Sequence, residues 1–375
     1  MSGEGHSPYW QEGGARLLRA DVLRGLQSLP SESVHCVVTS PPYLGLRAYG
    51  TEPQVWGGDT LCPHDWQETT SYRGSPQRTG AEGPGFHDPE ATRRQRWSLS
   101  HDCRRCGAWR GELGSEDVHD CESWSRREPP CARCYVCHIR SIFAELWRVL
   151  HPSGTVWWNV ADSYNGSGGS GGDYGPGGRR AGQPGYPGRR LPALKPKDLA
   201  GIPWRTALAV QADGWYLRSS IIWAKPNGLP ESVRDRPVRS HEYVLLLAKR
   251  RHYFYDQDAV REPLAAASLA RARHGRGTEH KWAQAPARQT IAVRPPPNPH
   301  PLGRSRRDVW TIANRGFRGA HFATFPEGLV EPCISAGTSA GGCCSAPVTK
   351  LRLRADLTEE ERAEIIGYLR QKGAA

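Results

Sequence analysis

The chain of 375 residues has a formal net charge of +12, with 50 Lys and Arg against 38 Asp and Glu. Its length can bury a full α/β core, and its basic balance favours a nucleic-acid partner, although a GC-rich genome would also enrich arginine. The amino terminus is polar and no stretch approaches about 18 apolar residues, which excludes a signal peptide and a transmembrane helix. We therefore expect a cytoplasmic protein with no membrane partner, whose 11 cysteines are metal ligands or free thiols rather than disulfides.

The first predicted elements are a strand and a short helix within residues 16–29. Asp21 lies where the strand ends, a position that suits a helix N-cap. A second strand, Val34 to Thr39, is β-branched and apolar, and it stops at Ser40-Pro41-Pro42-Tyr43 because two prolines cannot continue a β-ladder. Ligands bind at the carboxyl ends of strands in open α/β sheets, so this motif is predicted to line a site.

The residue types of this motif suit methylation of an exocyclic amine on a nucleobase. Such an amine is a poor nucleophile because its lone pair is delocalised into the ring. The Ser40 hydroxyl and the Pro41 carbonyl would accept its two hydrogens, and the Tyr43 ring would stack on the base. The alternative is a strand that ends in a Pro-Pro turn with a surface tyrosine, and four residues alone leave both interpretations open.

Residues 51–138 change in character, with many Gly, Pro, Arg, Trp and Cys and little periodicity, so something other than an apolar core must hold them. Two ligand pairs, Cys62-x-His64 and Cys103-x2-Cys106, have the residue types and spacing of a zinc knuckle, and the ion would close a loop of roughly 40 residues. Unrelated reduced thiols are the alternative. A second group of cysteines gives a weaker metal signal, and its Cys137 also fits the core of a helix. This second group comprises Cys121, Cys131, Cys134 and Cys137.

The pattern returns to α/β after this cysteine-rich segment. A helix is predicted from Val136 to Leu150 and a strand from Thr155 to Val160, which together make a crossover typical of a parallel sheet. A further helix is predicted over 203–212, and strands are predicted over 215–225 and 242–249. A last helix is predicted over 357–371, with a capping box at its start.

The motif and its surroundings resemble the catalytic region of DNA amino-methyltransferases. The resemblance rests on Thr39-Ser40-Pro41-Pro42-Tyr43, on Ala20 to Leu26, and on matching segments over 15–50, 139–166, 194–260 and 306–337. A catalytic motif near the amino terminus looks like the circularly permuted β class, and its Ser form resembles the N4-cytosine enzymes more than the N6-adenine enzymes. The resemblance implies a Rossmann-like methyltransferase fold, with a mostly parallel sheet and helices on both faces, to which the Cys-rich, zinc-type insertion is added.

The resemblance also implies which residues act. It assigns catalysis on a flipped base to Ser40, Pro41, Pro42 and Tyr43. It places Asp21, Thr39, His321, Thr324 and Pro326 near S-adenosylmethionine, and it makes Lys225, Arg234 and Arg239 candidates for contacts with DNA phosphates, with plain surface charge as the alternative. The implied reaction is methylation of cytosine N4 in double-stranded DNA. The alternatives are adenine N6 methylation, or a degenerate relative that binds DNA without turnover. A cognate restriction endonuclease would be a further partner.

The chain departs from the permuted pattern near its end. In that pattern a strand and an acidic-Pro-Phe-x-Gly-Ser-Gly turn follow the helix after Pro326, and the turn grips the cofactor. Here Gly337 to Cys344 comes next and is a poor substitute, because no strand leads into it. We therefore expect that a second polypeptide or an unusual tail supplies the loop, or that the chain is a truncated or degenerate relative that binds DNA without turnover.

The expected organisation has six parts. The catalytic domain covers residues 1–50 and 139–260, and the insertion over 51–138 interrupts it. A basic target-recognition or linker segment over 261–305, a cofactor-proximal segment over 306–342 and an atypical tail over 343–375 follow. The recognised DNA sequence cannot be deduced from these residues.

Overall fold

The structure is a computed structural model, and the chain forms two compact units. One unit comprises residues 1–253 with 309–327, and the other comprises 254–308 with 328–375; each is described by itself. The residues that the structure describes are 10–12, 15–18, 20–45, 52–69, 100–118, 128–165, 191, 193–228, 230–231, 233–274, 300–315 and 325–339.

A five-stranded sheet with the order β11-β9-β10-β8-β3 forms the centre of the first unit. Its strands are β3 (Val34–Thr39), β8 (Leu150–Val160), β9 (Tyr216–Ala224), β10 (His241–Ala248) and β11 (Val309–Thr311). β3 pairs with β8 and β11 with β9 in parallel, whereas β10 is antiparallel to both of its neighbours. The expectation of a mostly parallel sheet is therefore wrong. The reason is that β9 and β10 are joined directly, without the crossover helix that a parallel connection needs.

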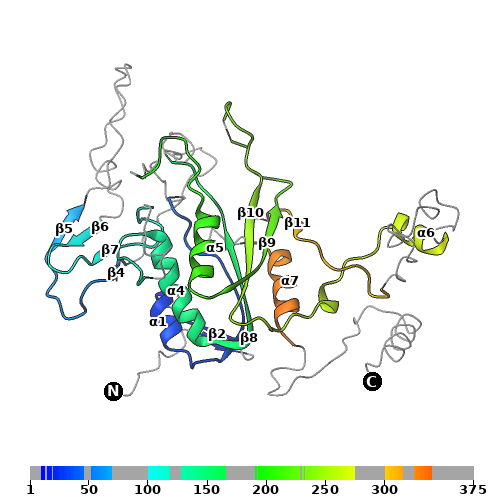
Figure 1. The fold of residues 1–375 in the computed structure, drawn as a ribbon, viewed down its shortest axis with the longest axis horizontal. Helices are drawn as coiled ribbons and strands as arrows, with labels where there is room; N and C mark the ends of the chain where they lie inside the picture. The colour runs from blue at the N-terminus through cyan, green and yellow to red at the C-terminus, as the bar shows by residue number, and fades with distance from the viewer. Residues whose placement is uncertain are drawn as a thin grey trace, which may run out of the picture. The chain divides into compact units, whose positions relative to one another are not determined.

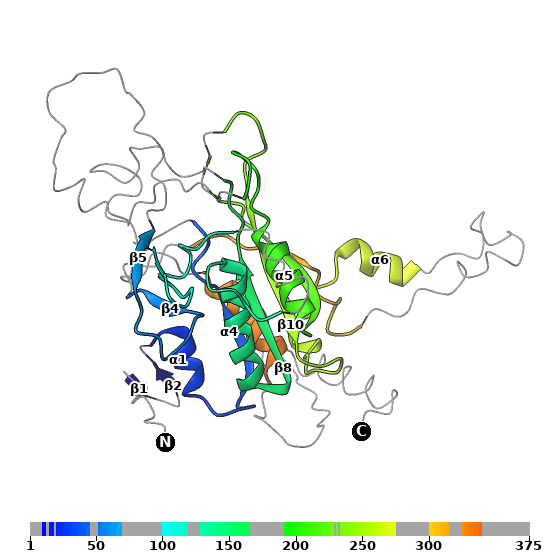
Figure 2. The ribbon, with the colours of Figure 1, turned by 60° about the vertical axis from the view of Figure 1, so that its left-hand side comes forward.

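Three helices of this unit are described, namely α1 (Val22–Gln27), α4 (Tyr135–Val149) and α5 (Ile202–Ala212). Two views of the ribbon show α4 and α5 side by side along one face of the sheet (Figures 1 and 2). α1 is tied to the end of α4, because the Arg148 guanidinium donates hydrogen bonds to the carbonyls of Leu26 and Leu29. The bounds predicted for α4, α5, β9 and β10 are confirmed to within a few residues. β8 begins at Leu150 and is therefore longer than the predicted strand from Thr155 to Val160.

The core follows from the two periodicities of the sequence. Ile139, Phe143 and Leu146 recur at helical spacing on α4 and are buried. On β8, alternate residues face the helices, so that the Trp158 ring lies 4.8 Å from the Phe143 ring, whereas Trp157 points to the other face and lies 6.2 Å from Trp310. The long apolar run of β8 therefore serves both faces of the sheet.

The cysteine-rich segment contains a small antiparallel sheet of its own, with the order β4-β7-β6-β5. Its strands are β4 (Gln54–Trp56), β5 (Trp66–Thr69), β6 (Ser100–Cys103) and β7 (Trp109–Gly111). The sequence did not predict this sheet, because strands of three or four residues are too short to show a period. Near the amino terminus, β1 (Trp10–Glu12) and β2 (Ala15–Leu17) form a hairpin, so the strand expected before α1 belongs to this hairpin and not to the main sheet.

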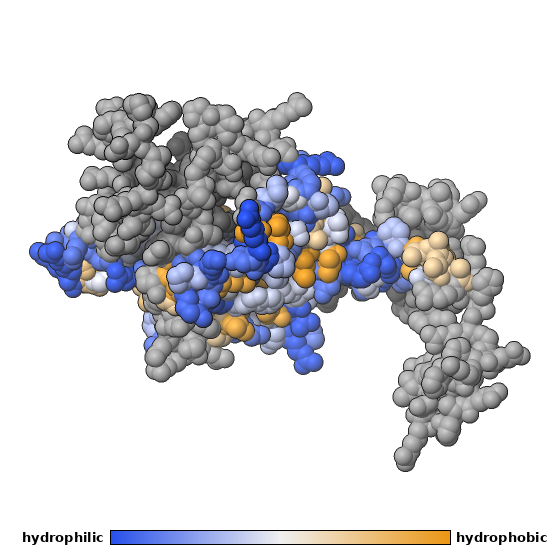
Figure 3. All heavy atoms as spheres, turned by 90° about the horizontal axis from the view of Figure 1, so that it is seen from above, coloured by the Kyte–Doolittle hydropathy of each residue, from blue (hydrophilic) through white to orange (hydrophobic). Residues whose placement is uncertain are grey.

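The second unit contains η1 (Asp258–Val260), α6 (Ala266–His274) and most of α7 (Glu327–Gly337). Glu262 and Arg304 hold two distant stretches of this unit together through paired backbone hydrogen bonds and an ion pair of 3.1 Å. The helix expected over 357–371 lies outside the described residues. None of the helices that the structure describes is long and apolar enough to cross a membrane. In the view from above, hydrophobic and hydrophilic side chains of the described surface lie close together near the centre (Figure 3).

Candidate active site

The predicted motif lies at the carboxyl end of β3, directly after Thr39. β3 runs parallel to β8, so the end of β8, with Asn159, reaches the same edge of the sheet. β10 runs the opposite way and pairs Tyr243 with Val160, so the first residues of β10 also reach this edge. Strand direction therefore brings the motif, Asn159 and Glu242 together from segments that are far apart in the sequence.

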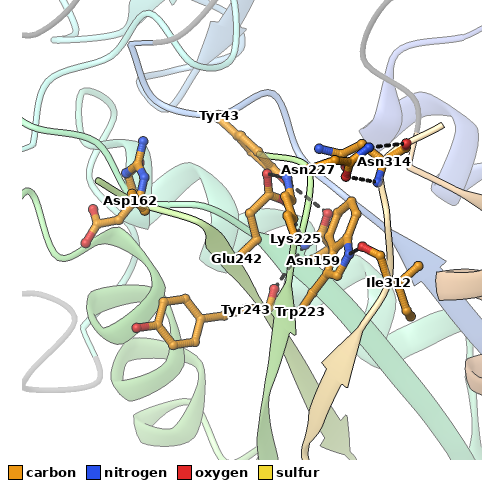
Figure 4. A network of polar contacts seen from close by, with 11 residues as sticks. Tyr43, Asn159, Asp162, Trp223, Lys225, Asn227, Glu242, Tyr243, Ile312 and Asn314 are labelled. Atoms are coloured by element: carbon orange, nitrogen blue, oxygen red, sulfur yellow. Dashed lines mark hydrogen bonds and ion pairs between the residues drawn. The ribbon is translucent and has the colours of Figure 1, made fainter. Parts of the chain in front are cut away.

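The hydroxyl of Tyr43 is anchored at this edge. Its Oη lies 2.8 Å from Asn159 Oδ1 and 2.8 Å from Glu242 Oε2, and its single hydrogen serves one of these acceptors at a time. The Asn159 amide donates to Glu242 Oε2 and to the Tyr243 carbonyl, each at 3.1 Å, which fixes the amide in turn (Figure 4). Tyr43 is therefore a half-buried, oriented side chain of this edge rather than a free surface tyrosine.

Lys225 belongs to the same network. Its ammonium forms an ion pair with Glu242 Oε1 and lies 4.0 Å from the centre of the Trp223 ring. The side chains of Lys225 and Glu242 are only 16% and 15% exposed, so both charges are largely removed from water and depend on each other. The contact of Lys225 with a DNA phosphate stays a prediction. In the structure its ammonium is paired with Glu242 beside the motif.

Glu242→Gln is expected to loosen this network. The variant leaves the Lys225 ammonium without a carboxylate, and we expect the free energy of unfolding to fall by about 1–3 kcal/mol. Urea denaturation measures the change. Asp235→Asn is the matched control, because it breaks an exposed ion pair with Lys197. The Asp235 and Lys197 side chains are 59% and 82% exposed, so this substitution should change the free energy of unfolding little. Equal stability of Glu242→Gln and the parent would contradict the importance of the pair.

Asp162, just beyond β8, caps a helix. Its carboxylate accepts hydrogen bonds from the backbone N–H groups of Ser163, Gly201 and Ile202 at 2.9, 3.0 and 3.1 Å, which ties the end of β8 to the start of α5. Burial raises the pKa of the Asp162 carboxyl, against the opposing effect of these donors. Burial, and then the charge of Asp162, raise the pKa of the Tyr243 hydroxyl.

The arginines predicted to contact DNA have different surroundings. Arg239 is half-buried and donates to the backbone carbonyl of Asp162. Arg234 is exposed. Between them, the Arg236 guanidinium stacks 3.8 Å from the centre of the Tyr164 ring, an arrangement that the sequence did not suggest. Contacts of Arg234 and Arg239 with phosphate stay predictions.

The predicted cofactor residues are only partly described. Asp21 caps α1, because its Oδ1 accepts from the backbone N–H groups of Leu23 and Arg24 at 3.0 and 3.4 Å. Thr39 ends β3 opposite Trp158, and Pro326 is buried directly before α7. His321 and Thr324 lie outside the described residues. The capping role of Asp21 is thus observed, whereas a cofactor role for this set stays a prediction.

The first cysteine pair and its partners do come together. One ligand atom from each of Cys62, His64, Cys103 and Cys106 lies within 4.8 Å of the others. The two sulfurs of Cys62 and Cys103 are 3.9 Å apart, and Cys106 Sγ is 3.4 Å from His64 Nδ1. Tetrahedral ligands about 2.3 Å from a central ion would lie roughly 3.8 Å from one another, so the donor set and its spacing fit zinc.

Two thiols of this group have pKa values shifted in opposite directions. For Cys103, desolvation is outweighed by hydrogen bonds from the backbone N–H groups of Cys106 and Arg105, and its pKa is lowered to about 6. Desolvation and the neighbouring thiols raise the pKa of Cys62 to about 12. Gly58 lies against the site with a φ of +74°, and a side chain there would meet Cys106 Sγ at 2.8 Å. The turn therefore requires glycine where it passes the sulfur.

The second cysteine group is different. Cys134 and Cys137 are buried in the main core at the start of α4, and Cys131 packs against that core. Hydrogen bonds with Cys131 and Cys137, followed by burial, raise the pKa of the Cys134 thiol. Cys121 lies outside the described residues. Within the described part of the chain, this group supplies core thiols, as the helical spacing of Cys137 suggested.

The family model described as DNA methylase, for N6 and N4 methyltransferases, matches residues 34–345. The chain belongs to this DNA methylase family. Type II methyltransferase M.XycI of Xanthomonas campestris pv. cyanopsidis is 34% identical over 328 residues, which cover 88% of this chain and 74% of the relative. M.SmaI of Serratia marcescens is 30% identical over 328 residues, which cover 87% of this chain and 76% of the relative.

A solved structure titled PvuII DNA methyltransferase (cytosine-N4-specific) is 16% identical with a TM-score of 0.39, and covers 85% of this chain and 69% of its own. This DNA methylase is therefore an S-adenosylmethionine-dependent DNA methyltransferase, on the strength of its family and its Type II relatives. The resemblance noted in the sequence is confirmed at this level.

Two residues that anchor the motif, Asn159 and Glu242, were not predicted to do so. Asn159 is a lone polar residue in the apolar run of β8, and Glu242 begins the apolar strand β10. A buried polar residue at the end of a strand needs a partner, and this was the available signal. The sequence does not show the direction of β10. Because β10 runs antiparallel to β8, Glu242 and Asn159 lie at the same edge of the sheet.

Proposed function

We propose that this methyltransferase methylates the N4 amine of cytosine in double-stranded DNA. The observation that carries the proposal is the Ser40-Pro41-Pro42-Tyr43 motif at the end of β3, with its tyrosine hydroxyl fixed by Asn159 and Glu242. The Ser form of the motif favours cytosine over adenine. Adenine N6 is the alternative target, because both amines present two hydrogens in the same geometry.

In the proposed mechanism the cytosine leaves the duplex at a cost of a few kcal/mol and stacks on the Tyr43 ring. The Ser40 hydroxyl and the Pro41 carbonyl accept the two amine hydrogens, which turns the nitrogen lone pair toward the methyl donor. Both prolines hold these acceptors rigidly, so little reorganisation is needed. S-adenosylmethionine, when bound, supplies an electrophilic sulfonium methyl group. No thiolate is required, and burial raises the pKa of Cys36, inside β3, to about 11.

The residues at the start of the chain fit such a cofactor. The two described hydrogen bonds of the Asp21 side chain both use Oδ1, and a carboxylate at this position can accept from a ribose hydroxyl. We propose that Asp21, Thr39 and Pro326 hold S-adenosylmethionine, together with His321 and Thr324. A catalytic motif near the start and a cofactor segment near residue 326 give the order of the circularly permuted class, which we also propose for this chain.

The remaining contacts proposed for this enzyme involve DNA, zinc and proteins. Arg234 and Arg239, with Lys225, would hold phosphates of the target strand beside the site. Zinc would be held by Cys62, His64, Cys103 and Cys106, with a structural role in the insertion. A cognate restriction endonuclease is the proposed biological partner, as part of a restriction-modification pair. A second chain that contributes to the cofactor site is a further proposed partner.

The test uses the whole chain with methyl-labelled S-adenosylmethionine and double-stranded DNA. The product is digested to nucleosides and analysed by mass spectrometry, and N4-methylcytosine is the expected product. N6-methyladenine would overturn the assignment of the base. Calorimetric titration with S-adenosylmethionine accompanies the assay. If DNA binds but the cofactor does not, the chain is either a half-enzyme that needs a second polypeptide or a relative without turnover.

A further inference from the structure

A buried, hydrogen-bonded pair of side chains lies outside the residues used by the proposed mechanism. Glu116 and His138 are 0% and 1% exposed. His138 Nδ1 is 2.8 Å from Glu116 Oε1, and His138 Nε2 is 2.7 Å from the backbone carbonyl of Ala132. The Ala132 carbonyl only accepts, so His138 Nε2 donates to it, and His138 Nδ1 shares a hydrogen bond with Glu116 Oε1. The Trp56 ring stacks on this imidazole at 4.1 Å between centroids, which fixes the plane of the imidazole.

The second oxygen of Glu116 reaches toward the catalytic motif. Glu116 Oε2 accepts a hydrogen bond of 2.5 Å from the backbone N–H of Gly114, and the Gly114 carbonyl accepts one of 3.0 Å from Gly45, two residues after Tyr43. Gly114 has a φ of +97°, and a Cβ there would lie 3.2 Å from the Tyr43 carbonyl oxygen and 3.3 Å from Pro42 Cβ. The backbone of Gly114 therefore lies directly against Pro42 and Tyr43.

The helix that carries His138 makes a second contact with the motif. Tyr135 lies one turn earlier on α4, is fully buried, and its hydroxyl donates a hydrogen bond of 2.9 Å to the Pro42 carbonyl. Its own backbone N–H donates to the carbonyl of Asp117, next to Glu116. The motif is thus held from two sides by elements that meet at the Glu116–His138 pair.

We propose that the Glu116–His138 pair positions the catalytic motif, through Gly114 on one side and Tyr135 on the other. Both side chains are buried, and removal of one leaves the polar atoms of the other without their hydrogen-bond partner, so the pair holds its surroundings in one arrangement. The proposed acceptors of the amine hydrogens lie on Ser40 and Pro41, next to Pro42, and a displacement of about 1 Å can lower a rate 100-fold. The inference rests on the catalytic role proposed for Ser40 to Tyr43.

Two substitutions of Glu116 separate positioning from bulk stability. In Glu116→Gln the amide oxygen accepts from the Gly114 N–H, and the amide nitrogen donates to His138 Nδ1, so both contacts are kept. Glu116→Ala loses both contacts. We expect Glu116→Ala to lower kcat on the order of 100-fold with little change in KM for DNA, and Glu116→Gln to remain near the parent.

Hydrogen exchange of the peptide over residues 40–45, measured on the free protein by mass spectrometry, gives a readout that does not depend on turnover. Exchange should be faster in Glu116→Ala and unchanged in Glu116→Gln, because the Gly45 amide is bonded to Gly114. A Glu116→Ala variant that melts at a lower temperature, but keeps the parent's exchange in this peptide, would overturn the proposal. This comparison decides the matter even if the proposed reaction is not observed.

Tyr135→Phe keeps the test decisive if Glu116→Ala does not fold. It removes the hydrogen bond to the Pro42 carbonyl and leaves the ring in the core. Tyr253→Phe is the matched control, since that hydroxyl accepts from Arg218 at the far end of β9. Faster exchange over residues 40–45 and a lower kcat in Tyr135→Phe alone support the proposal, whereas equal values in the two variants contradict it.

Discussion

A Ser40→Ala variant is expected to lose about 10²–10³-fold in kcat, with KM for DNA and the affinity for S-adenosylmethionine nearly unchanged. The hydroxyl is proposed to accept one amine hydrogen only as the lone pair turns toward the methyl group. Its loss therefore raises the barrier to the chemical step more than it weakens binding. Single-turnover methylation with the enzyme in excess over the DNA, followed by nucleoside analysis, measures the rate of that step.

Ser33→Ala is the matched control for this substitution. Ser33 lies just before the other end of β3, where its hydroxyl donates 2.7 Å to the Pro30 carbonyl in an exposed turn, and its removal should leave kcat near the parent. Calorimetry on both variants shows whether the cofactor still binds. A Ser40→Ala enzyme that methylates at the parent's rate would remove Ser40 from the mechanism.

The second large effect concerns the group formed by Cys62, His64, Cys103 and Cys106. We expect the purified protein to contain zinc in a one-to-one ratio, and Cys106→Ser to lose it. Closing a loop of roughly 40 residues costs about 3 kcal/mol of chain entropy. The bound ion offsets this cost between Cys62 and Cys103, and its loss removes that contribution. The small sheet β4 to β7 should then lose protection from hydrogen exchange and from proteolysis.

Metal analysis and a chelator titration provide the measurements. Cys333→Ser is the control, because that buried thiol donates to the Leu329 carbonyl on α7, and a serine hydroxyl can make the same bond. It should keep the full amount of zinc. If the parent protein contains no stoichiometric metal and the chelator leaves β4 to β7 unchanged, the four residues are reduced thiols and an imidazole that lie close together without a ligand.

Local sequence signals predicted the parts of the structure that depend on neighbouring residues. The end of β3 is sharp because Pro41 and Pro42 follow Thr39, and α4 is visible from its apolar spacing. The direction of β10 depends on pairing between distant strands, so the mixed sheet was not predictable in this way. Tyr43 meets Asn159 across 116 residues and Glu242 across 199, and no local pattern encodes either contact.

The ambiguous carboxylates show a second limit of sequence patterns. An aspartate just after a strand suits both a ligand site and a helix cap, and in Asp21 the structure shows the cap. Asp162 also follows a strand, and it caps α5 through backbone N–H groups that lie about 40 positions later in the sequence. For the zinc-type group, spacing alone left reduced thiols as an alternative. The pairing of β5 with β6, which sets Trp66 opposite Cys103, is what brings the two ligand pairs together.

The long sequence separation between Tyr43 and Glu242 also sets the order in which the site is completed during protein synthesis. Tyr43 leaves the ribosome 199 residues before Glu242, and at about 5–20 residues per second this interval lasts roughly 10–40 s. Through that period the tyrosine hydroxyl has no Glu242 to meet, although β3 is already made. A nascent chain arrested before β10 should therefore leave its growing site unfinished, and a methyl group could reach DNA only after most of the polypeptide has emerged.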